Sequence, residues 1–381
     1  MKAIINGKII MENEVISGKA LLFDEKINGI VDREALNDFE NLEIIDAEDN
    51  YVSPGLIDVH IHGSGGRDTM EGTMEALETI SRSIAGNGVT SFLPTTMTMD
   101  RESIYRAFDA VREAMKINMP GAQVLGTHME GPFINEKYKG AQNPKYIVEP
   151  DYDFIKDYLD VIKILTFAPE KDENHKFIDK MKEHEEIVLS IGHSNATYAQ
   201  AMEAIERGVR HVTHTFNAMT PLNHREPGIV GAAFRSNITC ELIADTIHVH
   251  PAVFKILKDI KGNDKVVLIT DCMMAGCMED GVYELGGQKV VVKDRAARLE
   301  DGTLAGSVLT LNRAIKNMLD NTDLEVYEAV AMASLNPARV IGMDDVKGSI
   351  KKGKDADLVI FDDEFNAITT IVKGNTVFNK R

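Results

Sequence analysis

The sequence predicts an α/β fold: a (β/α)8, TIM-like metallo-barrel joined to a small β-sandwich domain built from both chain ends. Three observations lead to this prediction. Short apolar runs recur along the chain, each followed by a polar loop and an amphipathic stretch. Side chains of the metal-ligand type stand where several of these runs end. Strand-like segments with many turn residues occupy the first ~50 residues and return in the C-terminal tail.

The two ends of the chain read as β-structure. The first strands are expected in AIINGKII, ALLFDEKINGIV and LEIIDAEDNYVS, where two Asn-Gly pairs predict tight hairpins. The tail returns to strand character in ADLVIFD and AITTIVKGNTVF. Because chain ends often meet in one module, we expect residues 1–52 and 346–381 to form the small domain. Residues 53–345 would then form the catalytic barrel.

From Pro54 the pattern becomes apolar strand, polar loop and amphipathic helix, repeated as a closed barrel requires. The expected barrel strands are Leu56–His62, Val89–Thr95, Gln123–Met129, Val161–Phe167, Ile187–His193, His211–Phe216, Thr239–Ala244 and Val266–Asp271. Helices between them are expected, for instance, at Thr73–Ala85, Glu102–Lys116, Tyr198–Arg207 and Ala252–Asp259. YELGGQKVVVKDRAARLEDGTL then reads as an inserted hairpin, and a helix at Leu309–Leu319 would close the barrel.

Composition narrows the class of protein. With 381 residues, 44% of them apolar, the chain can bury a large core. The net charge of −18, with no compensating basic stretch, argues against nucleic-acid or anionic-membrane partners. We find neither a signal-peptide pattern nor a membrane span, and three cysteines suit a reducing cytoplasm. Cys272 and Cys277 resemble half a metal site, but no second pair completes it, so we interpret them as buried small hydrophobes.

Six side chains at the ends of the apolar runs suit a metal site. They are His60, His62, Glu130, His193, His214 and Asp271. Residues i and i+2 of a strand face the same side, so His60 and His62 can chelate one ion. Imidazole and carboxylate together favour a borderline divalent ion such as zinc or iron. Asp271, at the end of the eighth strand, is placed to accept a proton from a water that the ion has made acidic.

Most of the other polar residues near the ends of the expected strands have two interpretations. His211 has the wrong strand parity relative to His214 and is expected to point outward, whereas His128 shares parity with Glu130 and suits either a supporting or a packing role. His248 and His250 follow the seventh strand, either as donors to an anionic substrate or as loop residues. In FNAMTPLNHREPG, the backbone and amide of Asn217 and Ala218 offer donors, and Arg225 offers a phosphate-binding fork or a solvated surface arginine.

The motifs together go beyond a generic metallo-barrel. PGLIDVHIHG, THMEGPF, IGHSNAT, THTFNAM, REPG, IADTIHVHP, ITDCMMAG and LAGSVLTL resemble the N-acetylglucosamine-6-phosphate deacetylases of the amidohydrolase superfamily, in order along the chain. The resemblance implies hydrolysis of the acetamide of N-acetylglucosamine 6-phosphate, with Glu130, His193 and His214 holding the principal ion and Asp271 as general base and then acid. It implies that Asn217, Ala218, Arg225 and His248 hold the sugar phosphate, while Ala141, Gln142, Leu304, Ala305 and Gly306 line the amide and sugar pocket. It also implies a homo-oligomer, most simply a homodimer, and leaves open whether Arg225 serves its own site or a partner's.

Three features of the chain vary among the relatives. Some have lost the first-strand histidine pair and use a single ion; this chain keeps His60 and His62, so a second ion is expected to fit. Gln142 stands where some relatives carry a histidine that polarises the acyl carbonyl, and Gln offers only a neutral donor. Thr246 stands where a glycine is frequent.

Two other functions compete with this one. Another amidohydrolase could act on a related N-acyl amino sugar or a cyclic amide. Cyclic-amide hydrolases usually bridge two ions with a modified lysine at the end of the fourth strand, whereas Lys163 lies near the start of that strand and Glu130 supplies the acidic ligand. A metal-free barrel serving only in assembly should lack several ligands, and this chain lacks none of them.

Overall fold

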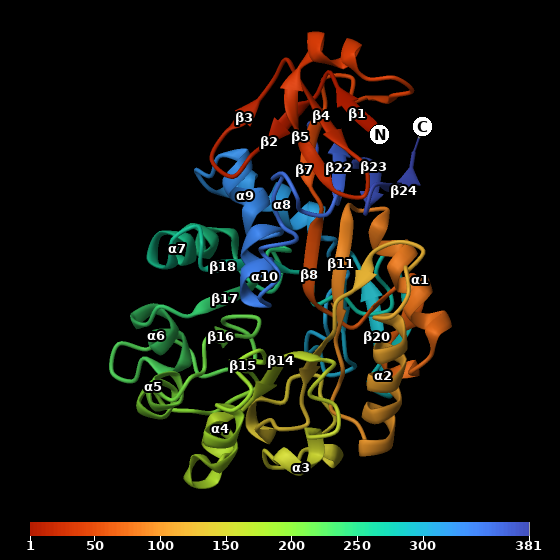
Figure 1. The fold of residues 1–381 in the computed structure, drawn as a ribbon. Coiled ribbons are helices and arrows are strands. Elements are labelled where there is room, and N and C mark those ends of the chain that lie inside the picture. The colour runs from red at the N-terminus through yellow and green to blue at the C-terminus, as the bar shows by residue number, and fades with distance from the viewer. Residues whose placement is uncertain (381) are drawn as a thin grey trace.

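The computed structural model describes residues 1–380, and its main body is a barrel of parallel strands surrounded by helices (Figure 1). The barrel strands are β8 (Leu56–Ile61), β11 (Val89–Pro94), β12 (Gln123–Val124), β13 (Thr127–Glu130), β14 (Ile162–Phe167), β15 (Val188–Ile191), β16 (His211–Val212), β17 (Thr239–Ile243) and β18 (Val266–Ile269). They form a three-stranded sheet, β12-β11-β8, and a six-stranded sheet from β13 to β18. Bridges from Thr95 to His128 and from Ile61 to Cys272 join the two sheets at both edges. The predicted α/β barrel fold is confirmed.

The five helices for which bounds were predicted lie within two residues of those bounds, among ten α-helices in the described residues. They are α1 (Met74–Ala85), α2 (Arg101–Ala114), α3 (Tyr152–Ile155), α4 (Lys176–Met181), α5 (Tyr198–Glu206), α6 (Gly228–Arg235), α7 (Pro251–Lys261), α8 (Leu311–Asn321), α9 (Val326–Met332) and α10 (Leu335–Val340). Short polar side chains start several of them: Thr73 accepts from the backbone N–H of Ala76 to begin α1, and Asp100 accepts from Ser103 to begin α2.

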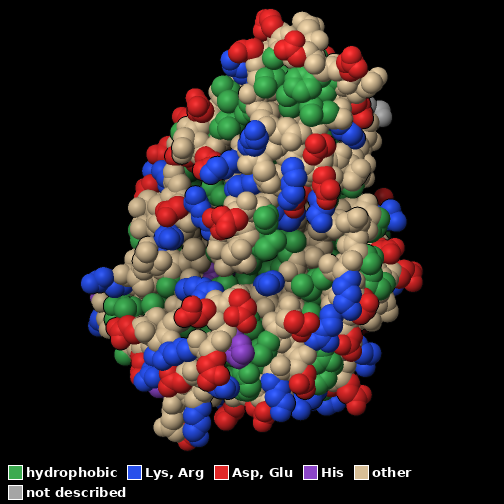
Figure 2. Space-filling model, viewed as in Figure 1, with side chains coloured by type: hydrophobic (Ala, Val, Ile, Leu, Met, Phe, Trp, Pro, Cys, Tyr) green, Lys and Arg blue, Asp and Glu red, His purple; other side chains and the backbone are tan. Residues whose placement is uncertain are grey.

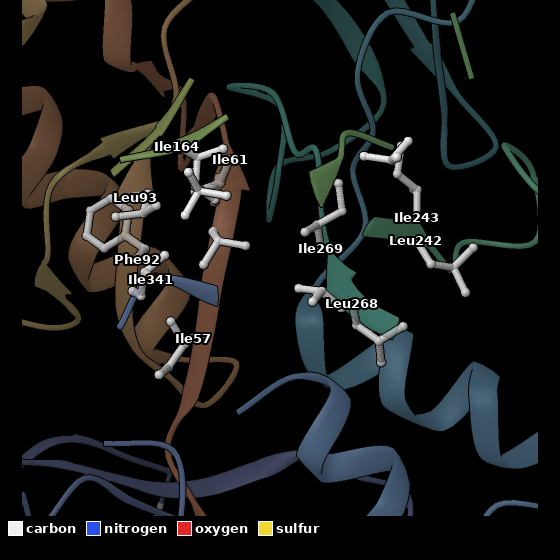
Figure 3. Packing of buried hydrophobic residues seen from close by; sticks show 14 of the residues in the cluster. Ile57, Ile61, Phe92, Leu93, Ile164, Leu242, Ile243, Leu268, Ile269 and Ile341 are labelled. Carbon is white, nitrogen blue, oxygen red and sulfur yellow. The ribbon is translucent and has the colours of Figure 1, made fainter. Parts of the chain in front are cut away.

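Alternate residues of a barrel strand face different surroundings. Ile57 and Ile61 of β8 lie beside Phe92 and Leu93 of β11 in the apolar cluster shown in Figure 3. The intervening positions of β8 carry polar side chains that bond groups inside the barrel, as described below for His60. One strand therefore contributes both to the hydrophobic core and to the site.

The two chain ends form a separate β-sandwich. One sheet has the order β5-β4-β1-β6 and the other β24-β23-β22-β7-β2-β3. These strands are β1 (Lys2–Ile5), β2 (Lys8–Ile10), β3 (Val15–Ile16), β4 (Lys19–Phe23), β5 (Ile27–Asp32), β6 (Glu43–Asp46), β7 (Tyr51–Pro54), β22 (Leu358–Phe361), β23 (Ala367–Val372) and β24 (Asn375–Asn379). Ile4, Phe23 and Leu358 belong to the one apolar core between the sheets. Figure 1 shows both termini in this part of the molecule. The boundaries at residues 52 and 346 stay predictions.

The two predicted Asn-Gly hairpins are wrong. Asn6, with φ 54°, and Gly7 carry the chain from β1 in one sheet to β2 in the other. Glycine is required at position 7 by packing, because an added Cβ would lie 2.4 Å from Val52 Cγ2. Asn28 and Gly29 lie inside β5, next to a register irregularity in its pairing with β4. An Asn-Gly pair alone does not show whether the chain makes a hairpin turn, passes from one sheet to another or forms a bulge.

The insert after the eighth strand is a three-stranded antiparallel sheet rather than a simple hairpin. Its strands are β19 (Gly281–Leu285), β20 (Gln288–Lys293) and β21 (Ala296–Arg298). Leu285 and Val290 pack with Met97 and Met273 in a small apolar cluster of their own. The insert is thereby held against the loops that follow the barrel strands.

The charged side chains of the surface are distributed as the composition of the chain leads us to expect. Acidic and basic side chains are interspersed over the face shown in Figure 2. Within residues 1–380 there is no helix of the length and apolar character needed to cross a membrane. The cysteine interpretation holds for Cys272, which is buried, but Cys277 is exposed.

Candidate metal centre and active site

A cavity of about 380 Å³ opens where the barrel strands end, and most of the predicted site residues line it. The lining residues are His62, Met97, Glu130, Gly140, Ala141, Gln142, His193, His214, Asn217, Ala218, His248, Asp271, Leu285, Arg298, Thr303, Leu304 and Gly306. His60 lies fully buried beside this cavity, and Ala305 is buried in the insert cluster. Arg225 is exposed and lies outside it, with Nη1 2.8 Å from His224 Nε2.

Glu130, His193 and His214 form one compact group of ligand atoms. Oε1 of Glu130 lies 3.1 Å from His193 Nε2 and 3.0 Å from His214 Nε2, and the two imidazole nitrogens are 3.1 Å apart. Two ligand atoms held at about 2.1 Å from one tetrahedral ion would lie roughly 3.4 Å apart. The three side chains are almost completely buried. Their donor atoms are therefore arranged as a single divalent ion requires.

His60 and His62 form a second group with the same carboxylate. His62 Nε2 lies 3.3 Å from Glu130 Oε2 and 3.2 Å from Asp271 Oδ1. His60 Nε2 lies 3.4 Å from Glu130 Oε1 and 3.5 Å from Asp271 Oδ1. This nitrogen is buried and has no hydrogen-bond partner. A buried imidazole nitrogen without a partner is costly, and a metal ion would satisfy it.

The hydrogen bonds of the four histidines fix their tautomers. Nδ1 of His62 lies 3.2 Å from the carbonyl oxygen of Thr95, and Nδ1 of His193 lies 2.9 Å from that of Tyr138. Nδ1 of His214 lies 3.2 Å from the Asn217 carbonyl. A carbonyl oxygen can only accept, so each Nδ1 donates and each neutral ring keeps its lone pair on Nε2. For His60, the partner of Nδ1 is a carboxylate, that of Glu241, which is described below. All four rings therefore present Nε2 to the shared centre, with Nδ1 held by an acceptor on the far side of the ring, as is typical of metal-ligating histidine.

The electrostatics of the cluster favour bound cations. Burial opposes a positive charge on His60, but the carboxylates of Glu241 and Glu130 outweigh burial and raise the pKa of His60 to about 9. Burial opposes protonation of His62 as well, yet Asp271 and Glu130 raise its pKa. Divalent ions would be drawn by the same carboxylates and would displace those protons.

The carboxyl group of Asp271 is held in its ionised form. Burial favours the neutral acid, but the neighbouring His60 and His62 lower the pKa of Asp271 below its usual range. An ionised carboxylate at the edge of the cavity is the form that can accept a proton from a bound water.

Backbone geometry turns three of these side chains into the cavity. His193, His214 and Asp271 each lie two residues beyond the end of a strand and have positive φ values of 47°, 28° and 49°. Such a conformation is strained for residues other than glycine and is concentrated at functional sites. It explains why β15, β16 and β18 end before the predicted strand ends. Thr246 also has a positive φ, 71°, a conformation that glycine adopts more easily than threonine.

The residues expected near the substrate are held by further hydrogen bonds. Asp245 accepts from His248 Nδ1 at 2.6 Å and from the backbone N–H of His248 at 2.7 Å. Gln142 donates to Oε2 of Glu130 at 2.7 Å. These contacts fix two of the side chains that line the cavity.

The prediction for His211 is wrong, and two buried carboxyl groups near the site were missed. His211 points inward, because its Nε2 lies 3.1 Å from Oε1 of the buried Glu241. β16 contains only two residues, so strand parity does not carry from His211 to His214. The only sequence feature that points to Glu241 is its charged side chain within the otherwise mostly apolar run TCELIA. Asp58 lies on the same face of β8 as His60, and burial raises its pKa to about 7. Arg298 and Thr303 of the insert also line the cavity without having been predicted.

Similarity to known proteins agrees with this geometry. Residues 51–377 match the Amidohydrolase family. The chain is 41% identical over 379 residues to the N-acetylglucosamine-6-phosphate deacetylase of Bacillus subtilis, covering 97% of this chain and 95% of that protein. It is 37% identical over 326 residues to an N-acetylgalactosamine-6-phosphate deacetylase of Escherichia coli O157:H7, covering 84% and 86% of the two chains. The crystal structure of the N-acetylglucosamine-6-phosphate deacetylase from Pasteurella multocida superposes with a TM-score of 0.93 at 34% identity, covering 98% of this chain and 99% of that one. The chain therefore belongs to the N-acetylglucosamine-6-phosphate deacetylases of the amidohydrolase family.

Proposed function

We propose that this protein hydrolyses the acetamide of N-acetylglucosamine 6-phosphate to glucosamine 6-phosphate and acetate. One observation carries the proposal: the Asp271 carboxyl group lies 3.2 Å from His62 Nε2, beside the Glu130–His193–His214 group and on the wall of a cavity. A carboxylate in this position would accept a proton from a water on an ion held by that group. Relatives that carry the same activity in their names support the substrate.

The residues fit one or two divalent ions. Glu130, His193 and His214 would hold the principal ion, and His60 and His62 would hold a second, with zinc or iron suited to these donors. When bound, the metal would polarise the amide carbonyl and lower the pKa of a water.

Asp271 would perform the proton transfers. Its carboxylate accepts a proton from the attacking water as the carbon–oxygen bond forms. It then donates that proton to the sugar nitrogen as the carbon–nitrogen bond breaks, so acetic acid and the amine form, and the acid passes its proton on to give acetate and the ammonium form of the sugar. Burial of the surrounding histidines excludes bulk water from this exchange.

The remaining predicted residues would hold the substrate. Ala141, Gln142, Leu304 and Gly306 line the cavity near the metal group and would contact the acetamide and sugar, with the buried Ala305 supporting that wall. Asn217, Ala218 and His248 line the same cavity and would bind the phosphate. Arg225 lies outside its own chain's cavity, so in the proposed homodimer it would complete the phosphate site of the partner.

Two related activities remain as alternatives. One relative is named for the galactosamine epimer of this substrate. A cyclic-amide hydrolase would use a lysine-bridged pair of ions, but Lys163 lies near the start of β14, whereas Glu130 takes part in two of the ligand groups. Three cysteines without disulfides are in accord with the proposed cytoplasmic location.

Acetate release tests the proposal. Protein purified without chelators should release acetate from N-acetylglucosamine 6-phosphate, with the galactosamine epimer, unphosphorylated N-acetylglucosamine and a cyclic amide measured in parallel. Metal analysis of the same preparation identifies the ion and its stoichiometry. Turnover of the cyclic amide alone would replace the proposed function with the rival one.

A further inference from the structure

Glu241, on β17, is a carboxylate at the centre of the barrel that the proposed reaction does not use. It is 0% exposed, and both of its oxygens have hydrogen-bond partners. Oε2 accepts from Nδ1 of His60 at 2.9 Å and from the backbone N–H of His214 at 2.9 Å. Oε1 lies 3.1 Å from Nε2 of His211. One side chain thus touches a residue from each of the two ligand groups.

The contact with His60 sets the direction of that ring. With Nδ1 held by Glu241, the opposite nitrogen, Nε2, faces Glu130 Oε1 at 3.4 Å and Asp271 Oδ1 at 3.5 Å. The other three histidines at the centre donate to backbone carbonyls. His60 alone among these four is oriented by a side chain, so its orientation depends on the residue at position 241.

Glu241 is not itself arranged as a ligand. It forms a possible three-residue group with His60 and His128, but His128 uses both of its nitrogens elsewhere. Nδ1 of His128 donates to the Val59 carbonyl at 3.0 Å, and its Nε2 lies 2.7 Å from the hydroxyl of Thr166. Without free donor atoms on His128, this group cannot close around an ion. Glu241 therefore acts on the centre through His60.

We propose that Glu241 is a positioning residue that fixes the ring of His60, so that the first-strand histidine pair can hold a second divalent ion. The proposal rests on the metal-dependent function proposed above. A carboxylate that accepts from the far nitrogen of a ligating imidazole orients the ring and increases its basicity, and loss of such a partner weakens metal binding by about 10–100-fold. The principal ion depends less on Glu241, because the ring of His214 is held by the Asn217 carbonyl.

Zinc binding by Glu241→Gln tests the proposal. Glutamine keeps the shape and one acceptor oxygen but removes the charge. Titration of metal-free protein with zinc should give two ions per chain in the unchanged protein. In Glu241→Gln the tighter ion should remain, and the weaker one should lose about 10–100-fold in affinity. His60→Ala should lose the same ion, and the double variant should lose nothing more, because both changes act through one ring.

Two further variants separate positioning from folding. Glu241→Asp keeps the buried charge but shortens the reach by one methylene, so it should show the same selective loss if Glu241→Gln does not fold. Asp172 is a buried carboxylate that accepts from the backbone of Phe177 and Ile178 at α4, and Asp172→Asn should leave both ions in place. Thermal melting of each metal-free variant reports any general loss of stability.

The outcomes decide the proposal. Selective loss of the second ion supports the positioning role of Glu241, whether or not the protein releases acetate. A failure of the positioning role can therefore be distinguished from a failure of the proposed reaction. Two ions bound to Glu241→Gln with unchanged affinity would overturn the positioning role. A single ion in the unchanged protein, or simultaneous loss of both ions from Glu241→Gln, would also overturn it.

Discussion

Gln142 donates a hydrogen bond from Nε2 to Oε2 of Glu130 at 2.7 Å, and its Oε1 accepts from the backbone N–H of Thr98 at 2.7 Å. Both ends of the amide are therefore engaged by the protein. Its donor is directed at a carboxylate of the metal group, whereas a donor to the acyl carbonyl of the substrate would point into the open cavity.

Gln142→Leu should consequently weaken the principal ion by about tenfold, because Glu130 loses the hydrogen bond that orients it. Zinc titration of the metal-free variant measures this effect. If metal affinity is unchanged while kcat falls, Gln142 instead acts on the substrate carbonyl, and its contact with Glu130 is broken when the substrate binds.

Asp271→Asn should retain the principal ion and lose turnover by about 10²–10⁴-fold, because the amide keeps the shape of the side chain but cannot accept the proton. Acetate release and metal content are measured on the same preparation. Activity close to that of the unchanged protein would remove Asp271 from the mechanism.

His214→Ala should remove the principal ion, since it deletes one of three protein ligands in a four-coordinate sphere. His193→Ala should do the same, and His60→Ala should leave this ion bound. Equilibrium dialysis distinguishes the variants. If His60→Ala abolishes all metal binding, the first-strand pair is the main site and the assignment of the two groups is reversed.

The sequence predicted best where local periodicity persists in the fold. β8 is a regular six-residue strand, so the i, i+2 relation placed His60 and His62 at one centre. The same reasoning failed for His211, because β16 ends after two residues and the chain then enters left-handed conformations at His214. The polar residues at the strand ends do not indicate that Glu241 of β17 contacts the ring of His60 on β8. That contact spans the intervening strand β18, and no local pattern in either segment predicts it.

Thr246→Gly should stabilise the protein. A β-branched residue at φ 71° is strained by about 1–2 kcal/mol, and Thr246 is exposed, so little packing is lost on substitution. The greater freedom of glycine in the unfolded chain offsets about 0.5–1 kcal/mol of that gain. We expect a net increase of about 0.5–1 kcal/mol in the free energy of unfolding. Urea denaturation checks the sign, and a decrease would mean that the threonine side chain makes a stabilising contact in the assembled protein.

Arg225→Ala should reduce the preference for the phosphorylated sugar, because a guanidinium fork contributes only when a phosphate is present to accept from it. The measure is the ratio of kcat/KM for N-acetylglucosamine 6-phosphate to that for N-acetylglucosamine. Arg295→Ala, a change at another exposed arginine that does not line the cavity, serves as the matched control. An unchanged ratio would make Arg225 a surface residue and place phosphate recognition on other groups such as His248.

Mixed dimers should show in which subunit Arg225 acts. Arg225 is outside the cavity of its own chain, so we expect it to reach the partner's phosphate site. In a dimer of one Asp271→Asn and one Arg225→Ala chain, one site would then combine an intact Asp271 with an intact Arg225 from the other chain. Such mixtures should recover activity on the phosphorylated sugar above the sum of the two parent variants, up to about one site in two. If Arg225 serves its own chain, every site in the mixed dimer carries one defect, and mixing restores nothing.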